Sequence, residues 1–297
     1  MSLHEETQTK PGQGQMIDVG GNRLFFRSSG EGSPTVILES GLGGSTGAFV
    51  WLERAIAKFT RVCVYDRAGL GKSETASSPY SFLESVKQLH TLLEKAEVNG
   101  PYILVGHSIG GILIREFTRR YPDEVAGLVF LDSSHPRQME YMPPSMKRQS
   151  KILVKLLNWP WLAKPLINMM IMKDAKLVPP ETAAELKAEF KSDKHFKATR
   201  AEYRDFDDFM EKTRDLGSLG ERPIAVLSAS LPEGTFMQTW HKLQGEIAGL
   251  SPNSTHQIVK GAKHVTLVTD QSYASLIVAE IEKMVEQLRA AKTEHPA

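Results

Sequence analysis

The sequence lacks cysteine pairs, an excess of charge of one sign and an uninterrupted apolar run. Its single cysteine, Cys63, excludes an intramolecular disulfide, and the apolar residues around it predict a buried strand position. The 36 Lys and Arg residues nearly balance 35 Asp and Glu, so the sequence has no excess of positive charge that would indicate nucleic-acid binding. The most apolar stretch, 152–172, is interrupted by lysines and prolines, and stable insertion into a membrane is not expected.

The N-terminus lacks the features of a signal peptide, and one glycine-rich turn lacks those of a phosphate-binding loop. Residues 1–15 are polar and contain no apolar signal-peptide region, so we expect a disordered lead-in and a cytoplasmic protein. The segment 66–73 follows a predicted strand but lacks the glycine spacing of a phosphate-binding loop. We interpret it as a structural turn in which Asp66 and Arg67 tie loops together.

Short apolar runs alternate with helical patterns along the chain. Apolar residues at helical spacing occur in 82–93 and 277–288. The runs are too short for helices, and most suit buried parallel strands. They are 36–38, 62–65, 102–105, 128–131 and 224–227, with a weaker candidate at 257–259 and an N-terminal hairpin arm at 23–26. This alternation predicts an α/β protein with a mostly parallel sheet between helices.

Residues 136–216 break the alternation, because they carry no strand signal and are rich in Met, Lys and Leu. A segment of this length is not a plain loop in a compact domain. We expect a helical cap at 136–216, inserted between two parts of one core, 16–135 and 217–292. Its apolar residues would face the core, a substrate or a membrane surface. Candidates to shape an acyl pocket are Trp159, Trp161, Met169, Met170 and Met172.

The strongest chemical signal is Gly-His-Ser-Ile-Gly-Gly at 106–111, between a predicted strand and a helical pattern. A nucleophile elbow requires this strand, tight turn and helix. Gly106 and Gly110 allow backbone segments to approach closely without a Cβ. Ser108 would then lie at a helix N-terminus, where partial positive charge favours an anion. Ser108 is therefore the predicted nucleophile.

A serine hydroxyl needs a base, and His264 is the best placed of nine histidines. It follows Gly261-Ala262-Lys263 in a turn before the last helix, near the carboxyl ends of the strands. His107 would point away from the site of attack, and His135 could line the pocket. Five others have helical or polar surroundings and are interpreted as solvated: His4, His90, His195, His241 and His256.

Two carboxylates could orient this histidine. Asp132 ends the strand at 128–131, and Glu233 lies just beyond the strand that ends near Ser228. We favour Asp132, because Pro232 occupies the place in the later turn where an aspartate is expected. For the oxyanion, two backbone N–H donors are expected, from Ile109 and from Leu42 in the turn after an earlier strand. No metal or organic cofactor is needed.

Four blocks together resemble the α/β-hydrolase superfamily, especially cofactor-free bacterial serine hydrolases with a helical cap. The blocks are Glu39-Ser40-Gly41-Leu42-Gly43, residues 66–73, residues 106–111 and residues 261–264, and the resemblance extends from about residue 20 to 290. It implies an eight-stranded, mostly parallel sheet flanked by helices, with the cap after the sixth strand. It also implies that Ser108 is the nucleophile, His264 the base, and Leu42 and Ile109 the oxyanion donors.

The sequence departs from the family pattern at two places. Ser40-Gly41 replaces the usual His-Gly of the oxyanion loop, and Pro232 stands where the family usually carries its acid. Some members, including certain haloalkane dehalogenases, carry the acid after the sixth strand, which falls on Asp132. Dehalogenation is not implied, because the nucleophile here is a serine.

These residues predict acyl transfer from a small-molecule carboxylic ester by a Ser-His-Asp triad through an acyl-enzyme. The same triad serves lactonases, thioesterases, C–C bond hydrolases and cofactor-free perhydrolases, and fold does not choose among them. A lipase acting at interfaces through 152–172 is another possibility. A ligand-binding receptor of this fold is disfavoured, because a binder needs no activated serine. The oligomeric state and the natural substrate stay open.

Overall fold

A computed structural model describes residues 12–76, 79–165, 175–215 and 217–294 of the 297-residue chain. These residues form one eight-stranded sheet of order β1-β2-β4-β3-β5-β6-β7-β8. β1 pairs antiparallel with β2, and β2 antiparallel with β4, whereas the remaining pairs are parallel. The strands are β1 Gln15–Asp18, β2 Arg23–Ser29, β3 Thr35–Glu39, β4 Val62–Tyr65, β5 Tyr102–His107, β6 Val125–Leu131, β7 Ile224–Leu231 and β8 Ser254–Lys263. The predicted α/β class, parallel sheet and N-terminal hairpin are confirmed.

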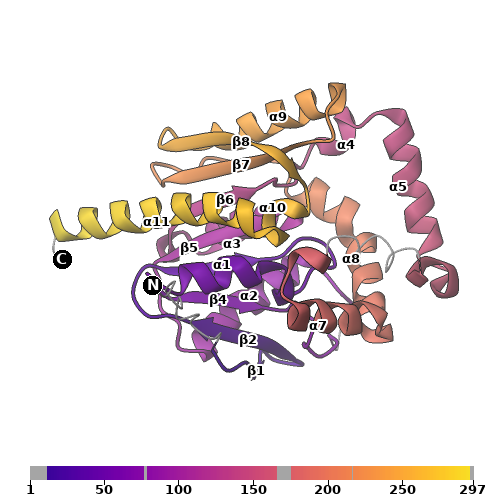
Figure 1. Ribbon diagram of the computed structural model, residues 1–297, viewed down its shortest axis with the longest axis horizontal. Coiled ribbons are helices and arrows are strands. Elements are labelled where there is room, and N and C mark those ends of the chain that lie inside the picture. The colour runs from indigo at the N-terminus through magenta and orange to yellow at the C-terminus, as the bar shows by residue number, and fades with distance from the viewer. Residues whose placement is uncertain (1–11, 77–78, 166–174, 216, 295–297) are drawn as a thin grey trace, which may run out of the picture.

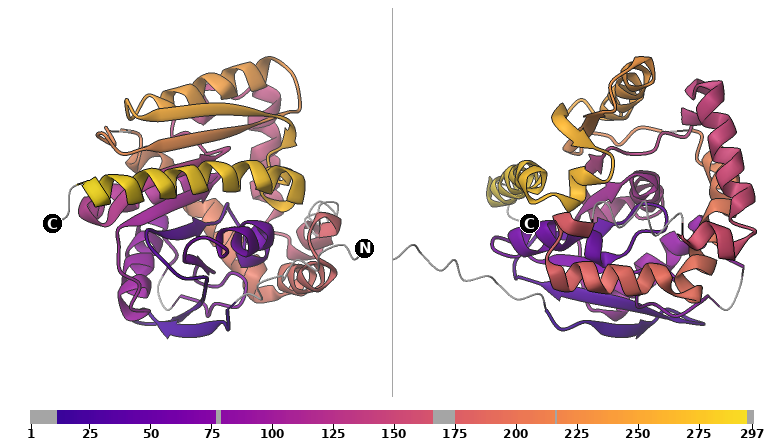
Figure 2. Two further views of the ribbon diagram at one scale, coloured as in Figure 1. Left: turned by 60° about the vertical axis from the view of Figure 1, so that its left-hand side comes forward. Right: turned by 45° about the vertical axis from the view of Figure 1, so that its right-hand side comes forward.

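Helices cover both faces of the sheet (Figures 1 and 2). The core and carboxyl-terminal helices are α1 Val50–Ile56, α2 Phe82–Lys95, α3 Ile109–Arg120, α9 Thr235–Ala248, α10 Thr266–Thr269 and α11 Gln271–Glu294, with 3₁₀ turns η1 Thr46–Phe49 and η2 Pro122–Glu124. Helices α1 and α11 pack on one face, and α2, α3 and α9 on the other. The sequence therefore folds into three layers, as alternating strands and helices predict.

The central strands contribute side chains to both layers, because successive residues of a strand point to opposite faces. In β5, Ile103 and Val105 join the apolar cluster under α1 and α11, whereas Leu104 joins the cluster under α2 and α3. Each of these three side chains is fully buried. Burial on both faces explains why the strand sequences are continuously apolar rather than alternating. Cys63 of β4 is buried in the same way, as predicted.

The regular elements in the described part of the segment between β6 and β7 are all helices, which are joined by turns and loops. They include α4 Gln138–Tyr141, α5 Pro144–Leu156, η3 Ala175–Leu177, α7 Pro180–Lys191 and α8 Asp193–Lys212. α8 packs against α2 and α7, whereas α5 stands at the right-hand edge of the molecule in Figure 1, away from the sheet. Among the described residues, no helix combines the length and apolarity that crossing a bilayer requires.

Candidate active site

Ser108 lies in the turn between β5 and α3, at the carboxyl edge of the sheet. Its backbone has φ 57° and ψ −124°, a left-handed conformation that L residues rarely adopt. Such strain costs on the order of 1–3 kcal/mol and persists only where surrounding contacts impose it. The Ser108 amide donates to the Leu131 carbonyl at 3.1 Å, and its carbonyl accepts from the amides of Gly111 and Ser134 at 3.0 and 2.8 Å. The turn is therefore fixed from both neighbouring segments.

Glycine is required on both sides of Ser108 by close backbone approach. A Cβ added to Gly106 would lie 2.5 Å from the Gly110 carbonyl oxygen. A Cβ on Gly110 would lie 2.5 Å from the Glu39 carbonyl oxygen at the end of β3. Neither backbone can move aside, so the Gly-x-Ser-x-Gly spacing follows from packing between β3, β5 and α3.

His264 and Asp132 meet at the same edge, although they are 132 positions apart in the chain. His264 follows β8, Asp132 follows β6, and the His264 Nδ1 lies 2.6 Å from the Asp132 Oδ2. The carboxylate is almost fully buried, whereas the imidazole is 44% exposed. Because an ionised carboxylate only accepts hydrogen bonds, Nδ1 carries the proton and Nε2 is left as a proton acceptor.

Asp132 is kept ionised by three donors. Burial by itself raises the pKa of this carboxyl, but hydrogen bonds from His264 and Trp240 and from the backbone outweigh that effect and lower it. The Trp240 Nε1 of α9 donates to Oδ1 at 2.8 Å, and the Ala229 amide donates to the same atom at 3.0 Å. Sequence reasoning missed Trp240, because a tryptophan on a helix is normally interpreted as packing.

His107 supports the backbone of His264. Its Nε2 lies 2.9 Å from the His264 carbonyl oxygen, and the two rings are 4.6 Å apart. Burial, together with the neighbouring His264, lowers the pKa of His107 to about 3, so this imidazole is neutral. Since a carbonyl only accepts, the Nε2 of His107 is the protonated nitrogen and is engaged. His107 is therefore not free to deprotonate Ser108.

The two predicted oxyanion donors come from opposite sides of Ser108. Ile109 is the first residue of α3, where a backbone N–H has no acceptor within the helix. Leu42 lies in the turn after β3, and a Cβ on its neighbour Gly41 would lie 3.2 Å from the Ser108 Cβ. Neither the Leu42 nor the Ile109 amide donates to a turn, loop or side-chain acceptor among the residues that the structure describes.

A buried ionic network lies beneath this turn. Arg67 donates to the Ser40 and Gly41 carbonyls, each at 2.8 Å, and to the carboxylates of Glu39 at 2.6 Å and Glu202 at 2.7 Å. Glu202, on α8, also accepts from the Gly43 amide at 2.6 Å. Asp66 accepts from the Thr46 and Lys72 amides at 2.8 and 2.9 Å. The prediction that Asp66 and Arg67 tie loops together is confirmed.

The prediction that His195 is solvated is wrong, because only 1% of its surface is exposed. Its Nδ1 accepts from the Gly71 amide at 3.1 Å, and its Nε2 lies 3.0 Å from the Gly43 carbonyl oxygen. Burial lowers the pKa of His195 to about 4, so it is neutral and Nε2 donates. Sequence reasoning could not find these partners, which are backbone groups of two remote turns.

Within the described residues, none of the other candidates is hydrogen-bonded to the side chains of Asp132 or His264. Glu233 is exposed in the loop after β7, and His135 is buried after β6. Trp159 and Trp161 are exposed rather than enclosed in a pocket. Of the remaining described histidines that were predicted to be solvated, His256 is exposed, as expected, whereas His90 and His241 are half-buried. His4 and the cap methionines Met169, Met170 and Met172 lie outside the described residues.

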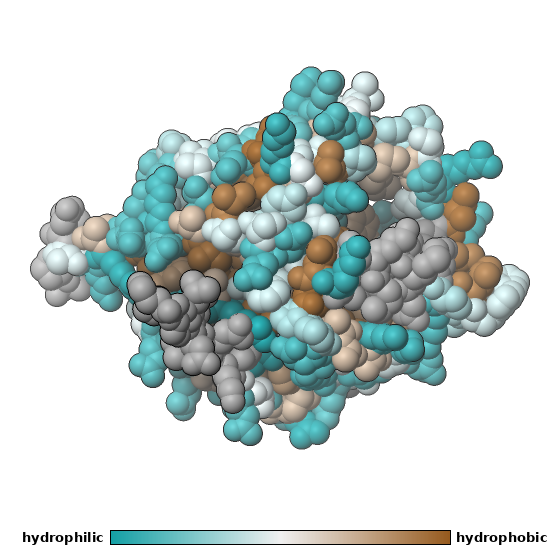
Figure 3. All heavy atoms as spheres, in the orientation of Figure 1, coloured by the Kyte–Doolittle hydropathy of each residue, from teal (hydrophilic) through white to brown (hydrophobic). Residues whose placement is uncertain are grey.

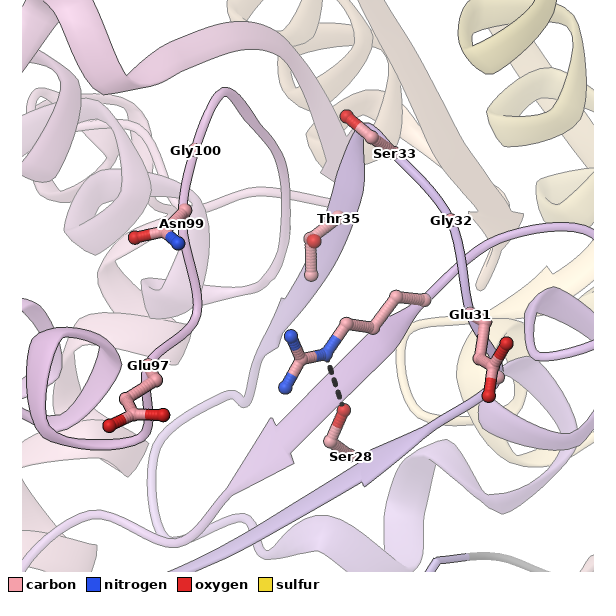
Figure 4. A pocket seen from close by; sticks show the side chains of 10 residues that line it. Ser28, Glu31, Gly32, Ser33, Thr35, Glu97, Asn99 and Gly100 are labelled. Atoms are coloured by element: carbon pink, nitrogen blue, oxygen red, sulfur yellow. Dashed lines mark hydrogen bonds between the residues drawn. The ribbon is translucent and has the colours of Figure 1, made fainter.

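A polar depression of about 470 Å³ lies at the opposite edge of the sheet (Figure 4). It is lined by residues at the amino-terminal ends of β3 and β5, including Thr35 and Gly100, and Arg61 donates there to the Ser28 hydroxyl at 2.8 Å. Ligands of open α/β sheets bind at the carboxyl ends of the strands, where Ser108 lies. Within the described parts of the chain, no cluster of three or more His, Cys, Asp or Glu side chains is arranged to bind a metal ion.

The chain belongs to the alpha/beta hydrolase fold family, whose model matches residues 34–271. Among solved structures it is similar to an esterase from Thermogutta terrifontis, with a TM-score of 0.68, 19% identity, and coverage of 92% of this chain and 100% of that one. It is similar to the epoxide hydrolase CorEH, with a TM-score of 0.70, 16% identity, and coverage of 93% and 99%. These identities show the fold alone.

One curated relative is the probable transporter efuK of Hormonema carpetanum, which is 32% identical over 154 residues. The match covers 49% of this chain and 22% of efuK. The chain spans at most 42% of the length of the leading curated relatives that it matches. The similarity to these relatives is therefore limited to part of each of them.

Proposed function

We propose that this protein hydrolyses carboxylic esters, with Ser108 as nucleophile, His264 as base and Asp132 as the acid that orients it. The observation that carries the proposal is the 2.6 Å contact between the His264 Nδ1 and the Asp132 Oδ2 at the sheet edge where the strained Ser108 turn lies. It leaves the His264 Nε2 available for a proton. The segment 136–216 is proposed as a cap, because its described helix α8 contacts Gly43 in the turn after β3 through Glu202 and His195.

The reaction takes two steps. The Ser108 Oγ attacks the ester carbonyl carbon, its proton moves to the His264 Nε2, and the carbonyl oxygen becomes an oxyanion. The Leu42 and Ile109 amides donate to that oxyanion, and each such donor lowers the barrier by about 2.7–4 kcal/mol. The bond to the alkoxy group breaks as His264 protonates the departing alcohol. Water then gives a proton to His264 and attacks the acyl carbon. The bond from that carbon to the Ser108 Oγ breaks as His264 returns the proton to this oxygen, which releases the acid and restores the serine hydroxyl.

Acyl chemistry fits a serine better than epoxide opening does. A serine oxygen that attacked an epoxide carbon would form an alkyl ether, which has no carbonyl carbon for water to attack. An acyl-enzyme keeps that carbonyl, so the same His264 that forms it can direct its hydrolysis. Similarity to an epoxide hydrolase in fold therefore does not transfer that reaction to this chain.

The first test is the hydrolysis of a chain-length series of nitrophenyl esters by the wild type and Ser108→Ala. We expect kcat to fall on the order of 10⁴- to 10⁶-fold, because the triad acts as a unit. Ser275→Ala, an exposed serine on α11, is the matched control and should keep full activity. Equal activity of wild type and Ser108→Ala would reject the proposal.

The same assay separates the two candidate acids. Asp132→Asn should lower kcat on the order of 10⁴-fold by loss of the correct histidine tautomer, whereas Glu233→Gln should change little. The reverse result would assign the role to Glu233. Covalent labelling by a fluorophosphonate distinguishes an enzyme from a binding protein: wild type should be labelled and Ser108→Ala should not. A wild type that resists labelling would favour the receptor interpretation.

A further inference from the structure

The segment around α5 carries charge of one sign in a chain that is nearly neutral. Residues 141–173 contain six Lys or Arg and no Asp or Glu. The rest of the chain contains the other 30 of the 36 basic residues and all 35 acidic residues. A local excess of positive charge attracts an anionic surface and repels a cationic one. The separation of charge therefore points to an acidic partner for this part of the molecule alone.

The basic side chains of α5 share one face. Lys147, Lys151 and Lys155 recur every fourth residue, and Arg148 lies beside them, so all four fall on adjacent parts of the helix surface. With Pro144 and Ile152 they line an open depression of about 490 Å³. Within the described residues, no carboxylate lies at ion-pair distance from Arg148, Lys151 or Lys155. These three cations are available to an external anion.

Large apolar side chains stand beside these cations. Trp159, in the short connection after α5, and Trp161, in the helical residues 160–165 that follow, are 58% and 72% exposed, and their rings form an edge-on pair 6.3 Å apart. Ile152, Val154 and Leu162 are also exposed. Apolar side chains are visible at this rim of the molecule, among polar ones, beside α5 and the residues that follow it (Figure 3). Tryptophans of this kind favour the boundary between water and lipid, where one end of the ring is wet and the other is not.

These side chains lie outside the buried cluster that joins this part of the chain to α8. The segment that follows α5 is joined to α8 through a small cluster of Leu157, Ala163 and Phe196, all buried. The cations and the two tryptophans lie outside that cluster. A soluble protein that exposes adjacent apolar side chains usually does so at a binding surface.

We propose that α5 and the residues that follow it, through Leu162, bind the surface of an anionic lipid bilayer. The cations would lie at the level of the lipid phosphates, and Trp159, Trp161 and Ile152 would enter the boundary with the acyl chains. Both classes of side chain are needed, which favours a bilayer over a soluble polyanion, since a polyanion offers nothing to the tryptophans. The proposal does not depend on the esterase activity proposed above.

The test is cosedimentation of the full chain with vesicles of phosphatidylcholine alone or mixed equally with phosphatidylglycerol. We expect binding to the anionic vesicles that weakens as salt is added, and little binding to neutral ones. Each Lys or Arg near an anionic surface strengthens binding about fivefold. The variant Arg148→Gln, Lys151→Gln, Lys155→Gln should therefore bind about 100-fold more weakly.

The matched control changes the same number of exposed cations elsewhere: Lys58→Gln, Lys242→Gln, Lys283→Gln. It should bind as the wild type does. Equal loss in both triple variants would reduce the effect to overall charge and overturn the proposal. Absence of binding by the wild type would overturn it directly.

Tryptophan emission reports whether the rings enter lipid. We expect a blue shift on addition of anionic vesicles, and its loss in Trp159→Phe, Trp161→Phe, which keeps apolar side chains and Trp51 and Trp240. Inorganic polyphosphate supplies anions without a bilayer and should cause no shift. A shift that survives in the double variant, or that polyphosphate reproduces, would contradict insertion of these rings.

Discussion

Helices α8 and α5 belong to the same segment between β6 and β7, yet their charged side chains lie in different surroundings. On α8, Glu202 is fully buried and bonded to Arg67 and to the Gly43 amide. On α5, Lys151 points into an open depression. A charged residue in a helical sequence therefore does not show whether its position is exposed or buried. That depends on whether the fold brings an oppositely charged or hydrogen-bonding group next to it.

The largest effect is expected at Glu202. Glu202→Ala leaves the buried Arg67 guanidinium short of a counter-charge, which costs about 3–5 kcal/mol of unfolding free energy, measured by urea denaturation. Glu211→Ala on the exposed side of α8 and Lys151→Ala on α5 should each stay within about 0.5 kcal/mol. A Lys151→Ala cost as large as that of Glu202→Ala would remove the contrast between the helices. Glu202→Gln, which keeps an acceptor for Gly43, should fall between the extremes.

A smaller effect is expected at His195, which connects α8 to the turn that contains Leu42. His195→Ala leaves the Gly43 carbonyl and the Gly71 amide without a partner, and each buried unsatisfied group costs about 1–3 kcal/mol. Because Gly43 adjoins Leu42, we expect kcat for ester hydrolysis to fall by up to about 10²-fold with KM little changed. The control His90→Ala removes a half-buried histidine of α2 that stacks on Tyr121, and should lower stability without lowering kcat. A His195→Ala enzyme with unchanged kcat would show that α8 only stabilises the fold.

The smallest effect concerns α7, which lies between the two helices in sequence. Burial, and then the nearby Asp66 carboxylate, raise the pKa of Glu189 to about 7. The folded protein therefore binds this proton more tightly than the unfolded chain, and the stability it contributes below pH 4.5 is lost as the pH rises through about 7. Glu189→Gln, which can still accept from the Ser45 hydroxyl, should gain Tm relative to the wild type at pH 8 but not at pH 4. A constant difference in Tm across that range would contradict the assignment.

Most of the fold could be predicted from the sequence, because it depends on local patterns. The runs at 102–105 and 128–131 lie within β5 and β6, and the apolar stripe at 277–288 lies within α11. The weakest prediction, 257–259, is the ten-residue strand β8, in which only Val259 and Ala262 are buried. An edge strand with so few buried positions carries little of the apolar signal on which strand prediction depends.

The site could be predicted only where a motif is contiguous. The turn around Ser108 can be predicted from the contiguous motif at 106–110. The sequence does not decide whether Asp132 or Glu233 is the partner of His264. The bond between Glu202 and Gly43 joins residues 159 positions apart, and no local pattern marks either. The prediction that His195 is solvated is wrong for the same reason, because its polar neighbours in sequence are not its neighbours in space. Periodicity gives the face of a helix, but not the backbone groups that the face will meet.

The buried position of Cys63 has a practical consequence. It is the only thiol in the chain, and burial raises its pKa to about 11, so at neutral pH it is neither ionised nor accessible to alkylating reagents. A second cysteine introduced on the surface, for example Lys58→Cys or Lys283→Cys, can therefore be modified selectively without replacing the native one. Spin labels or fluorophores attached there would report the orientation and distance of the molecule relative to a lipid surface.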